Sequence, residues 1–135
     1  MGWKFEKILK KLEDNRDIVV YLNYLSDEGR RQALMGAELL AQPAFYEGFG
    51  MQALEALAAG IPLVCSKVSS LPEVAGDAAV YFDPHDPIDI KNAMKAVLFD
   101  KSLAENLVTK GRERVKLFGW EKCAKETLKV LLETN

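Results

Sequence analysis

Histidine and cysteine are scarce in this chain of 135 residues, which has one histidine, His85, and two cysteines, Cys65 and Cys123. A protein metal site of the zinc type needs several such ligands at close spacing, and no Cys-x-x-Cys pair or Cys/His cluster occurs. The sequence therefore predicts no metal site. We expect His85, which lies in a turn-rich loop of Asp and Pro, to be a surface residue. The low cysteine content favours a reduced, cytoplasmic setting, with a disulfide between Cys65 and Cys123 as the alternative.

The chain also lacks an excess of charge and a long apolar run. Its formal net charge is −2, so there is no general electrostatic attraction to nucleic acid. The longest apolar run, residues 56–65, is interrupted by Gly60 and Pro62 and is far shorter than the ~20 residues of a membrane-spanning helix. No signal-peptide pattern is present. We therefore expect neither a nucleic-acid partner nor a transmembrane segment.

Residues 3–12 have the spacing of an amphipathic helix, with lysines between the apolar positions. We expect this helix to face the protein core with its lysine side in solvent. The alternative is a peripheral contact with an acidic membrane surface, because a basic amphipathic helix that carries a tryptophan, here Trp3, suits such a surface.

Strand-like and helix-like segments alternate along the chain, which is long enough to bury the core of one domain, residues 1–135. Strands are expected at 18–22, 38–42, 62–66 and 78–82, and the first has the composition of a buried parallel strand. Helices are expected at 27–36, 101–117 and 120–131, and also after Gly50 and after Asp86. Ser26 and Asp86 occupy N-cap positions. This order predicts an α/β fold with a mostly parallel sheet flanked by helices.

The stretch 47–60 joins two glycines to a short apolar helix, which is a suitable place for an anion. The first N–H groups of that helix, near Gly48 to Met51, have no partner inside it, and the helix dipole adds positive charge there. Glu47 is an acceptor and a candidate base, and Glu55 shares a helix face with Gln52, where it could accept hydrogen bonds from a sugar or ribose diol. The alternative is an ordinary first-turn acid followed by a solvated helix face.

Four segments, residues 43–50, 54–56, 60–62 and 71–79, resemble the donor-binding half of the group 1 (family 4) glycosyltransferases, which are retaining enzymes of the GT-B fold. Glu47 and Glu55 match the E-x7-E signature of that family, and the resemblance runs from about residue 18 to about residue 131. It implies a partial, Rossmann-like GT-B C-terminal domain. It also implies transfer of a sugar from a nucleotide-diphosphate sugar to an acceptor with retention, without a metal or a cofactor.

The resemblance also assigns roles to individual residues. Glu47 would be catalytic and would contact the donor sugar. The donor-binding residues would be Glu47, Gly48, Phe49, Gly50, Met51 and Glu55, with Glu55 on the ribose diol. The loop 67–70 is a further candidate ligand contact, whereas Glu73 is expected in a buried or capping salt bridge and the basic stretch 110–116 is expected as a solvated face.

The chain departs from the family pattern in what it lacks. The acceptor-binding N-terminal half is missing, as are the first donor-domain strands, whose loops usually supply an Arg and a Lys to the diphosphate. Smaller departures are Ala44 for Ser, Asn23 for Gly, Met51-Gln52 for Leu-Pro and Gly119 for a hydroxyl cap. We expect the isolated chain to be inactive without a missing domain or partner subunit. Because the absent strands would separate strand 18–22 from strand 38–42, we also expect a homo-oligomer or a rearranged sheet.

Two other functions stay open. One is a non-catalytic fragment, either a relic or an engineered domain, that folds and self-associates without turnover. The other is a GT-B sugar-nucleotide epimerase, although the pattern from Pro43 to Glu55 fits the transferases better.

Overall fold

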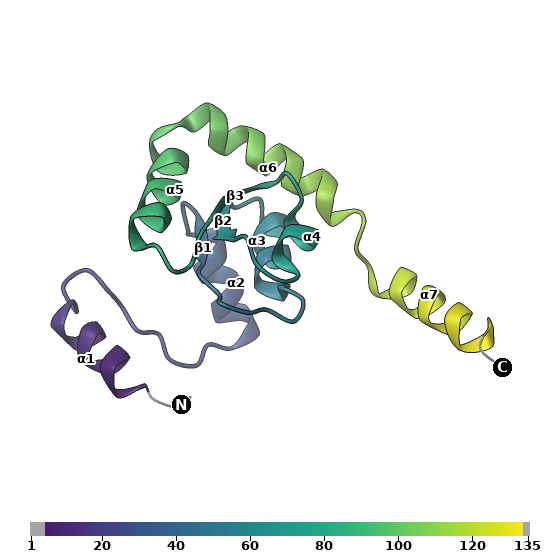
Figure 1. Ribbon diagram of the computed structural model, residues 1–135, viewed down its shortest axis with the longest axis horizontal. Coiled ribbons are helices and arrows are strands. Elements are labelled where there is room, and N and C mark those ends of the chain that lie inside the picture. The colour runs from purple at the N-terminus through teal and green to yellow at the C-terminus, as the bar shows by residue number, and fades with distance from the viewer. Residues whose placement is uncertain (1–4, 134–135) are drawn as a thin grey trace. The chain divides into compact units, whose positions relative to one another are not determined.

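The computed structural model describes residues 5–133, and the chain divides into two units, Met1–Gln32 and Ala33–Asn135. The first unit holds α1 (Glu6–Asp14) and most of α2 (Asp27–Met35). The second holds the strands β1 (Leu40–Gln42), β2 (Leu63–Ser66) and β3 (Ala79–Phe82). Its helices are α3 (Met51–Ala59), α4 (Leu71–Ala75), α5 (Pro87–Phe99), α6 (Lys101–Val115) and α7 (Trp120–Glu133) (Figure 1).

The second unit is built on a parallel three-stranded sheet in the order β1-β2-β3, among helices α3 to α6 (Figure 1). Successive side chains of a strand point to opposite faces, so the fully buried strand β2 contributes to two cores. Leu63 and Cys65 pack with residues of α3 and α4, whereas Val64 packs with residues of α5 and α6. The predicted α/β fold with a parallel sheet is therefore confirmed.

The strand predicted at residues 18–22 is wrong. The segment forms no strand, and its apolar side chains are exposed, from 38% for Val19 to 78% for Ile18 and Val20. A strand needs partners for its N–H and C=O groups, and the ladders within residues 5–133 join β1, β2 and β3 alone. The N–H groups of Ile18 and Val19 donate instead to the C=O of Asn15 in the preceding turn. Composition predicted a buried strand, but within residues 5–133 the segment takes part in none of the strand ladders.

The first predicted helix also differs from expectation. α1 begins at Glu6, and Trp3, on which the membrane alternative depends, lies outside the described residues. No residue of α1 is buried, and Ile8 is 61% exposed. Within the first unit, therefore, α1 has no buried side, and the expectation that it faces the protein core stays a prediction.

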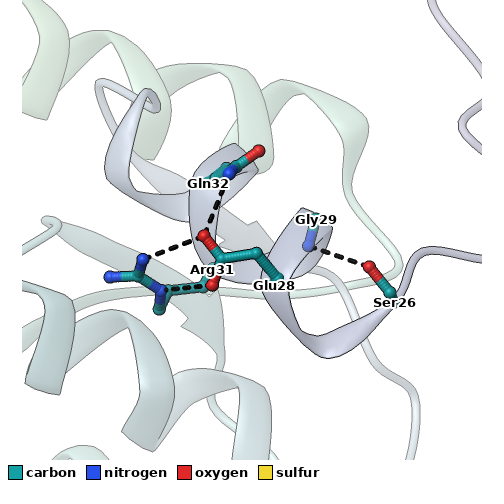
Figure 2. A network of polar contacts seen from close by, with 5 residues as sticks. All are labelled: Ser26, Glu28, Gly29, Arg31 and Gln32. Atoms are coloured by element: carbon teal, nitrogen blue, oxygen red, sulfur yellow. Dashed lines mark hydrogen bonds and ion pairs between the residues drawn. The ribbon is translucent and has the colours of Figure 1, made fainter.

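α2 begins at the predicted N-cap. The hydroxyl of Ser26 accepts a hydrogen bond from the N–H of Gly29 at 3.1 Å (Figure 2). The carboxylate of Glu28 accepts hydrogen bonds from Arg31 and Gln32, each at 2.9 Å. These bonds hold the pKa of Glu28 below its usual value, and the bond from Arg31 is the larger cause. Acidic residues in the first turn also suit the positive end of the helix dipole.

The predicted cap of α5 is confirmed, and α6 has a similar one. Asp86 accepts a hydrogen bond from the N–H of Ile88 at 2.8 Å, and Pro87 is the first residue of the helix. Asp100 likewise accepts from the N–H of Leu103 at 2.9 Å. The two aspartates fix where the polypeptide enters these helices, which cover one face of β2.

The basic residues of α6 form specific contacts in addition to a solvated face. Arg114 donates from Nε to the C=O of Val74 at 3.0 Å and from Nη2 to the C=O of Glu73, so it closes the C-terminal end of α4. The ammonium group of Lys110 lies 3.0 Å from the carboxylate of Asp77 and lowers the pKa of that carboxyl. The side chain of Glu73 is exposed, and none of the ion pairs within residues 5–133 includes it. The predicted salt bridge of Glu73 is therefore wrong.

Both cysteines are free thiols, so the structure contains no disulfide between them. Cys65 is buried in β2 and Cys123 is exposed on α7. Burial raises the pKa of the Cys65 thiol to about 12. Burial also raises the pKa of Tyr81 to about 12, and the hydroxyl of Tyr81 donates to the C=O of Gly76 at 2.5 Å.

α7 ends the described part of the protein and has no buried residue. Within residues 5–133, none of the helices combines the length and the apolar character needed to cross a lipid bilayer.

Candidate functional site

The loop of residues 43–50, called here the Glu47 loop, connects the end of β1 to the start of α3. It therefore lies at the carboxyl ends of the parallel strands, where ligands bind in open α/β sheets. The loop ends at Gly50, whose φ of +100° is unfavourable for residues with a side chain. A Cβ atom at this position would lie 2.9 Å from Cδ2 of Leu71. Gly50 thus fixes both the turn into α3 and its close packing on α4.

The N-terminus of α3 has no side-chain cap. Gly50 is the N-cap residue, and the first hydrogen bond of the helix runs from the N–H of Leu54 to its C=O at 3.1 Å. The N–H groups of Met51, Gln52 and Ala53 consequently have no partner within the helix and none from a capping side chain. Such a terminus can accept hydrogen bonds from a phosphate group, and the helix dipole adds about half a positive charge there.

Glu47 is held at three of its atoms. Its N–H donates to Oγ of Ser69 at 2.9 Å, and its C=O accepts from Oγ of Ser70 at 3.0 Å. Its carboxylate oxygen Oε2 accepts from Nε2 of Gln42 at 3.0 Å. The acid is half-buried and is tied to the end of β1 and to the loop that follows β2. These contacts place a carboxylate directly before the uncapped end of α3.

Gln42 is the buried partner in this arrangement. It is the last residue of β1 and is 6% exposed, and its backbone carbonyl accepts from Oγ of the fully buried Ser66 at 3.3 Å. The side-chain oxygen Oε1 of Gln42 is buried and has no hydrogen-bond partner within residues 5–133. An unsatisfied buried acceptor costs about 1–3 kcal/mol. An apolar side chain would avoid this cost at the same position.

The remaining predicted donor-binding residues surround the start of α3. Gly48 is exposed, and no atom lies within 4 Å of the position that a Cβ would occupy there. Phe49 and Met51 are partly exposed, and the half-buried Glu55 lies in the middle of α3. The six predicted residues therefore lie in the Glu47 loop and the first turns of one helix. Whether they bind a donor stays a prediction.

Aromatic side chains flank the Glu47 loop. The ring of Phe45 lies 4.8 Å from the ring of His85, which is exposed as predicted and follows β3. The ring of Phe49 meets the ring of Phe118 edge to face at 6.0 Å. Both ring pairs join the Glu47 loop to other parts of the second unit. The loop is therefore held by ring contacts of Phe45 and Phe49 in addition to the hydrogen bonds of Glu47.

Groups of three or more His, Cys, Asp or Glu side chains that could hold a metal ion do not occur among residues 5–133. The polar groups that the structure brings together at the site are the carboxylate of Glu47, the hydroxyls of Ser69 and Ser70 and the N–H groups at the start of α3.

The contacts that orient Glu47 were not predicted from the sequence. The serines of loop 67–70 were expected as candidate ligand contacts, whereas the structure commits Ser69 and Ser70 to the backbone of Glu47. Gln42 had no predicted role. A polar residue at the end of an otherwise apolar strand was the available signal, but the distance between Gln42 and Glu47 follows from the path of the loop and not from sequence spacing.

Comparison with known proteins gives consistent results. A sequence profile of the family described as "Glycosyl transferases group 1" matches residues 2–114. The O-antigen chain mannosyltransferase B of Escherichia coli is 37% identical over 94% of this chain and 34% of its own length. The MMP alpha-(1->4)-mannosyltransferase of Mycolicibacterium hassiacum is 35% identical over 93% of this chain and 31% of its own length.

Solved structures show the same relationship. Sucrose-phosphate synthase from Thermosynechococcus elongatus is 28% identical and superposes with a TM-score of 0.83, over 95% of this chain and 33% of that protein. WaaG, a glycosyltransferase involved in lipopolysaccharide biosynthesis, is 21% identical with a TM-score of 0.71 over 94% of this chain and 34% of that protein, which supports the fold alone. The chain spans about a third of the length of these relatives.

Proposed function

The chain belongs to the glycosyl transferases group 1 family, and we propose that it binds a nucleotide-diphosphate sugar as the donor-binding part of a retaining glycosyltransferase. The observation that carries this proposal is the position of Glu47. It is held at its N–H, its C=O and its carboxylate, directly before the uncapped N-terminus of α3. In this proposal, residues 1–135 act as one donor-binding domain.

Each part of the site has a role in this proposal. The carboxylate of Glu47 is the catalytic group and contacts hydroxyl groups of the donor sugar. Gly48, Phe49, Gly50 and Met51 lie against the sugar and the diphosphate, and Glu55 accepts hydrogen bonds from the ribose diol. The N–H groups at the start of α3 stabilise the negative charge of the leaving diphosphate. No metal ion or further cofactor is required for that stabilisation.

The relatives support a choice of donor and of reaction type. Two of them are named as mannosyltransferases, so a mannose-bearing nucleotide is the first donor to test. Membership of a transferase family favours sugar transfer over epimerisation.

The chain does not act alone in this proposal. Because it spans about a third of its relatives, the acceptor site and the basic residues for the diphosphate come from a further part of a longer protein or from a partner subunit. The isolated chain is then inactive in transfer although it binds the donor.

We also propose that the isolated chain forms a homo-oligomer. The exposed apolar segment 18–22 has a strand-forming composition, and β1 is at the edge of its sheet. Light scattering on the purified protein tests this: a dimer or larger species is expected, and a strictly monomeric species contradicts it.

Calorimetry tests donor binding directly. UDP, GDP and ADP and their sugar conjugates are titrated into the protein, and binding of one nucleotide is expected. Glu55→Ala should weaken that binding about tenfold or more, since it removes hydrogen bonds to a charged group. Glu105→Ala, on the exposed face of α6, is the matched control and should bind as the unaltered protein does. If Glu55→Ala binds the nucleotide as tightly as the unaltered protein does, the role of Glu55 is contradicted. If the unaltered protein binds none of these nucleotides or sugar conjugates, a non-catalytic domain is the better explanation.

A further inference from the structure

In the hydrogen bond between Gln42 and Glu47, the chemistry of the two groups fixes which side chain donates. An ionised carboxylate has only hydrogen-bond acceptors, so the side-chain amide must turn its NH₂ group toward Glu47. This places Nε2 3.0 Å from Oε2 of Glu47 and leaves Oε1 of the same amide buried and without a partner among the described residues.

None of the serine hydroxyls bonded around Gln42 and Glu47 donates to Oε1. The hydroxyl of Ser66 donates to the backbone carbonyl of Gln42, and the hydroxyl of Ser70 donates to the C=O of Glu47. Ser69 accepts from the N–H of Glu47. Only one of the two polar ends of the buried amide is therefore used, and its partner is the carboxylate of the proposed site.

We propose that Gln42 is a positioning residue for Glu47, retained for the direction in which it holds the carboxylate and not for the stability of the fold. This inference rests on the proposed function, in which Glu47 contacts the donor sugar. A buried side chain with an unsatisfied acceptor is a poor choice for stability alone, and such departures from good packing are expected at functional sites. Gln42 approaches Glu47 from the buried end of β1, so it restricts the acid without occupying the exposed side of the loop.

The substitution Gln42→Met separates positioning from stability. Methionine is similar in length and removes both the donor and the orphan acceptor. The variant is expected to melt at the same temperature as the unaltered protein or at a higher one. It should bind the nucleoside diphosphate unchanged, but the extra affinity that the attached sugar provides should fall by roughly three- to tenfold.

The controls distinguish this inference from the proposed function. Glu55→Ala should weaken binding of the nucleotide with or without its sugar, whereas Gln42→Met should affect the sugar conjugate alone. If the sugar conjugate binds Gln42→Met and the unaltered protein equally well, Gln42 does not position Glu47. A large loss of melting temperature in Gln42→Met would assign Gln42 to the stability of the core and would also overturn the inference.

If the unaltered protein binds no nucleotide, the proposed function is contradicted. The contact between Gln42 and Glu47 can then still be tested by a measurement without ligand. The side-chain amide protons of Gln42 can be followed by NMR. We expect them to exchange slowly with solvent in the unaltered protein and distinctly faster in Glu47→Ala. Equal exchange in the two proteins would mean that Glu47 is not the partner of the amide.

Discussion

The N–H of Glu47 donates a hydrogen bond to Oγ of Ser69, 2.9 Å away and 22 residues later in the sequence. The bond joins the loop after β1 to the loop after β2, and the hydroxyl of Ser70 adds a second bond to the C=O of Glu47. The conformation of the Glu47 loop is thus set by two serines that follow the adjacent parallel strand.

Loss of these hydroxyls should loosen the Glu47 loop. Ser69→Ala and Ser70→Ala are each expected to lower the free energy of unfolding by about 0.5–1.5 kcal/mol, the usual net value of one hydrogen bond. Both should also weaken binding of a nucleotide sugar. Urea unfolding and calorimetry measure the two effects. Ser102→Ala, at an exposed position of α6, is the control, and an equal response of all three variants would exclude a specific role for the loop contacts.

The two glycines of the loop should respond differently to the same substitution. Gly50→Ala places a side chain at a positive φ and within 2.9 Å of Leu71, and we expect a loss of about 2–4 kcal/mol from backbone strain and overpacking together. Gly48→Ala meets open space, so its unfolding free energy should change little. Thermal and denaturant unfolding test this, and a destabilised Gly48→Ala together with a native-like Gly50→Ala would refute it.

Arg114 should be the basic residue of α6 that matters most for stability. Its guanidinium donates to two backbone carbonyls of α4 and lies 5.5 Å from the centre of the Phe118 ring. Arg114→Met leaves those carbonyls without their donor, and a loss of about 1–3 kcal/mol is expected. Lys95→Met, at an exposed position of α5, should be nearly neutral. Similar unfolding midpoints for the two variants would show that the contacts of Arg114 with α4 do not contribute to stability.

The two cysteines should differ in reactivity. At pH 8 a thiol reagent should modify Cys123 rapidly and leave Cys65 unmodified until the protein unfolds, because Cys65 is buried and its pKa is raised to about 12. Rapid labelling of a native Cys123→Ser variant would contradict this.

The same raised pKa predicts alkaline destabilisation. Above pH 9 the unfolded thiol loses its proton while the folded thiol keeps it until about pH 12. The unfolded state then binds fewer protons, so the free energy of unfolding falls as the pH rises, by at most about 1.4 kcal/mol per pH unit for one group. Cys65→Ala should reduce this fall between pH 9 and 11. An identical pH dependence in both proteins would show that another group is responsible.

Local sequence patterns predicted the elements whose partners lie nearby in the sequence. The helix after Gly50, the caps at Ser26 and Asp86 and the strands around β1, β2 and β3 follow from capping chemistry and apolar runs, and they are present. Strand 18–22 was mispredicted because its composition carries no information about whether a neighbouring strand exists. The position of Glu47 could be predicted from the glycines around it, but the residues that orient it could not. Gln42 reaches Glu47 through the path of the Glu47 loop, and Ser69 is brought close by the parallel pairing of β1 and β2.

Donor binding is tested most simply by the melting temperature of the purified protein with UDP, GDP and ADP and their sugar conjugates, including a mannose conjugate. Binding to the folded state alone raises stability by about 2.7 kcal/mol at a ligand concentration of 100 Kd, which corresponds to a rise of several degrees for a protein of this size. We expect such a rise with one nucleotide and a smaller one in Glu55→Ala. A cooperative melting transition that none of these ligands shifts would contradict the proposed donor site.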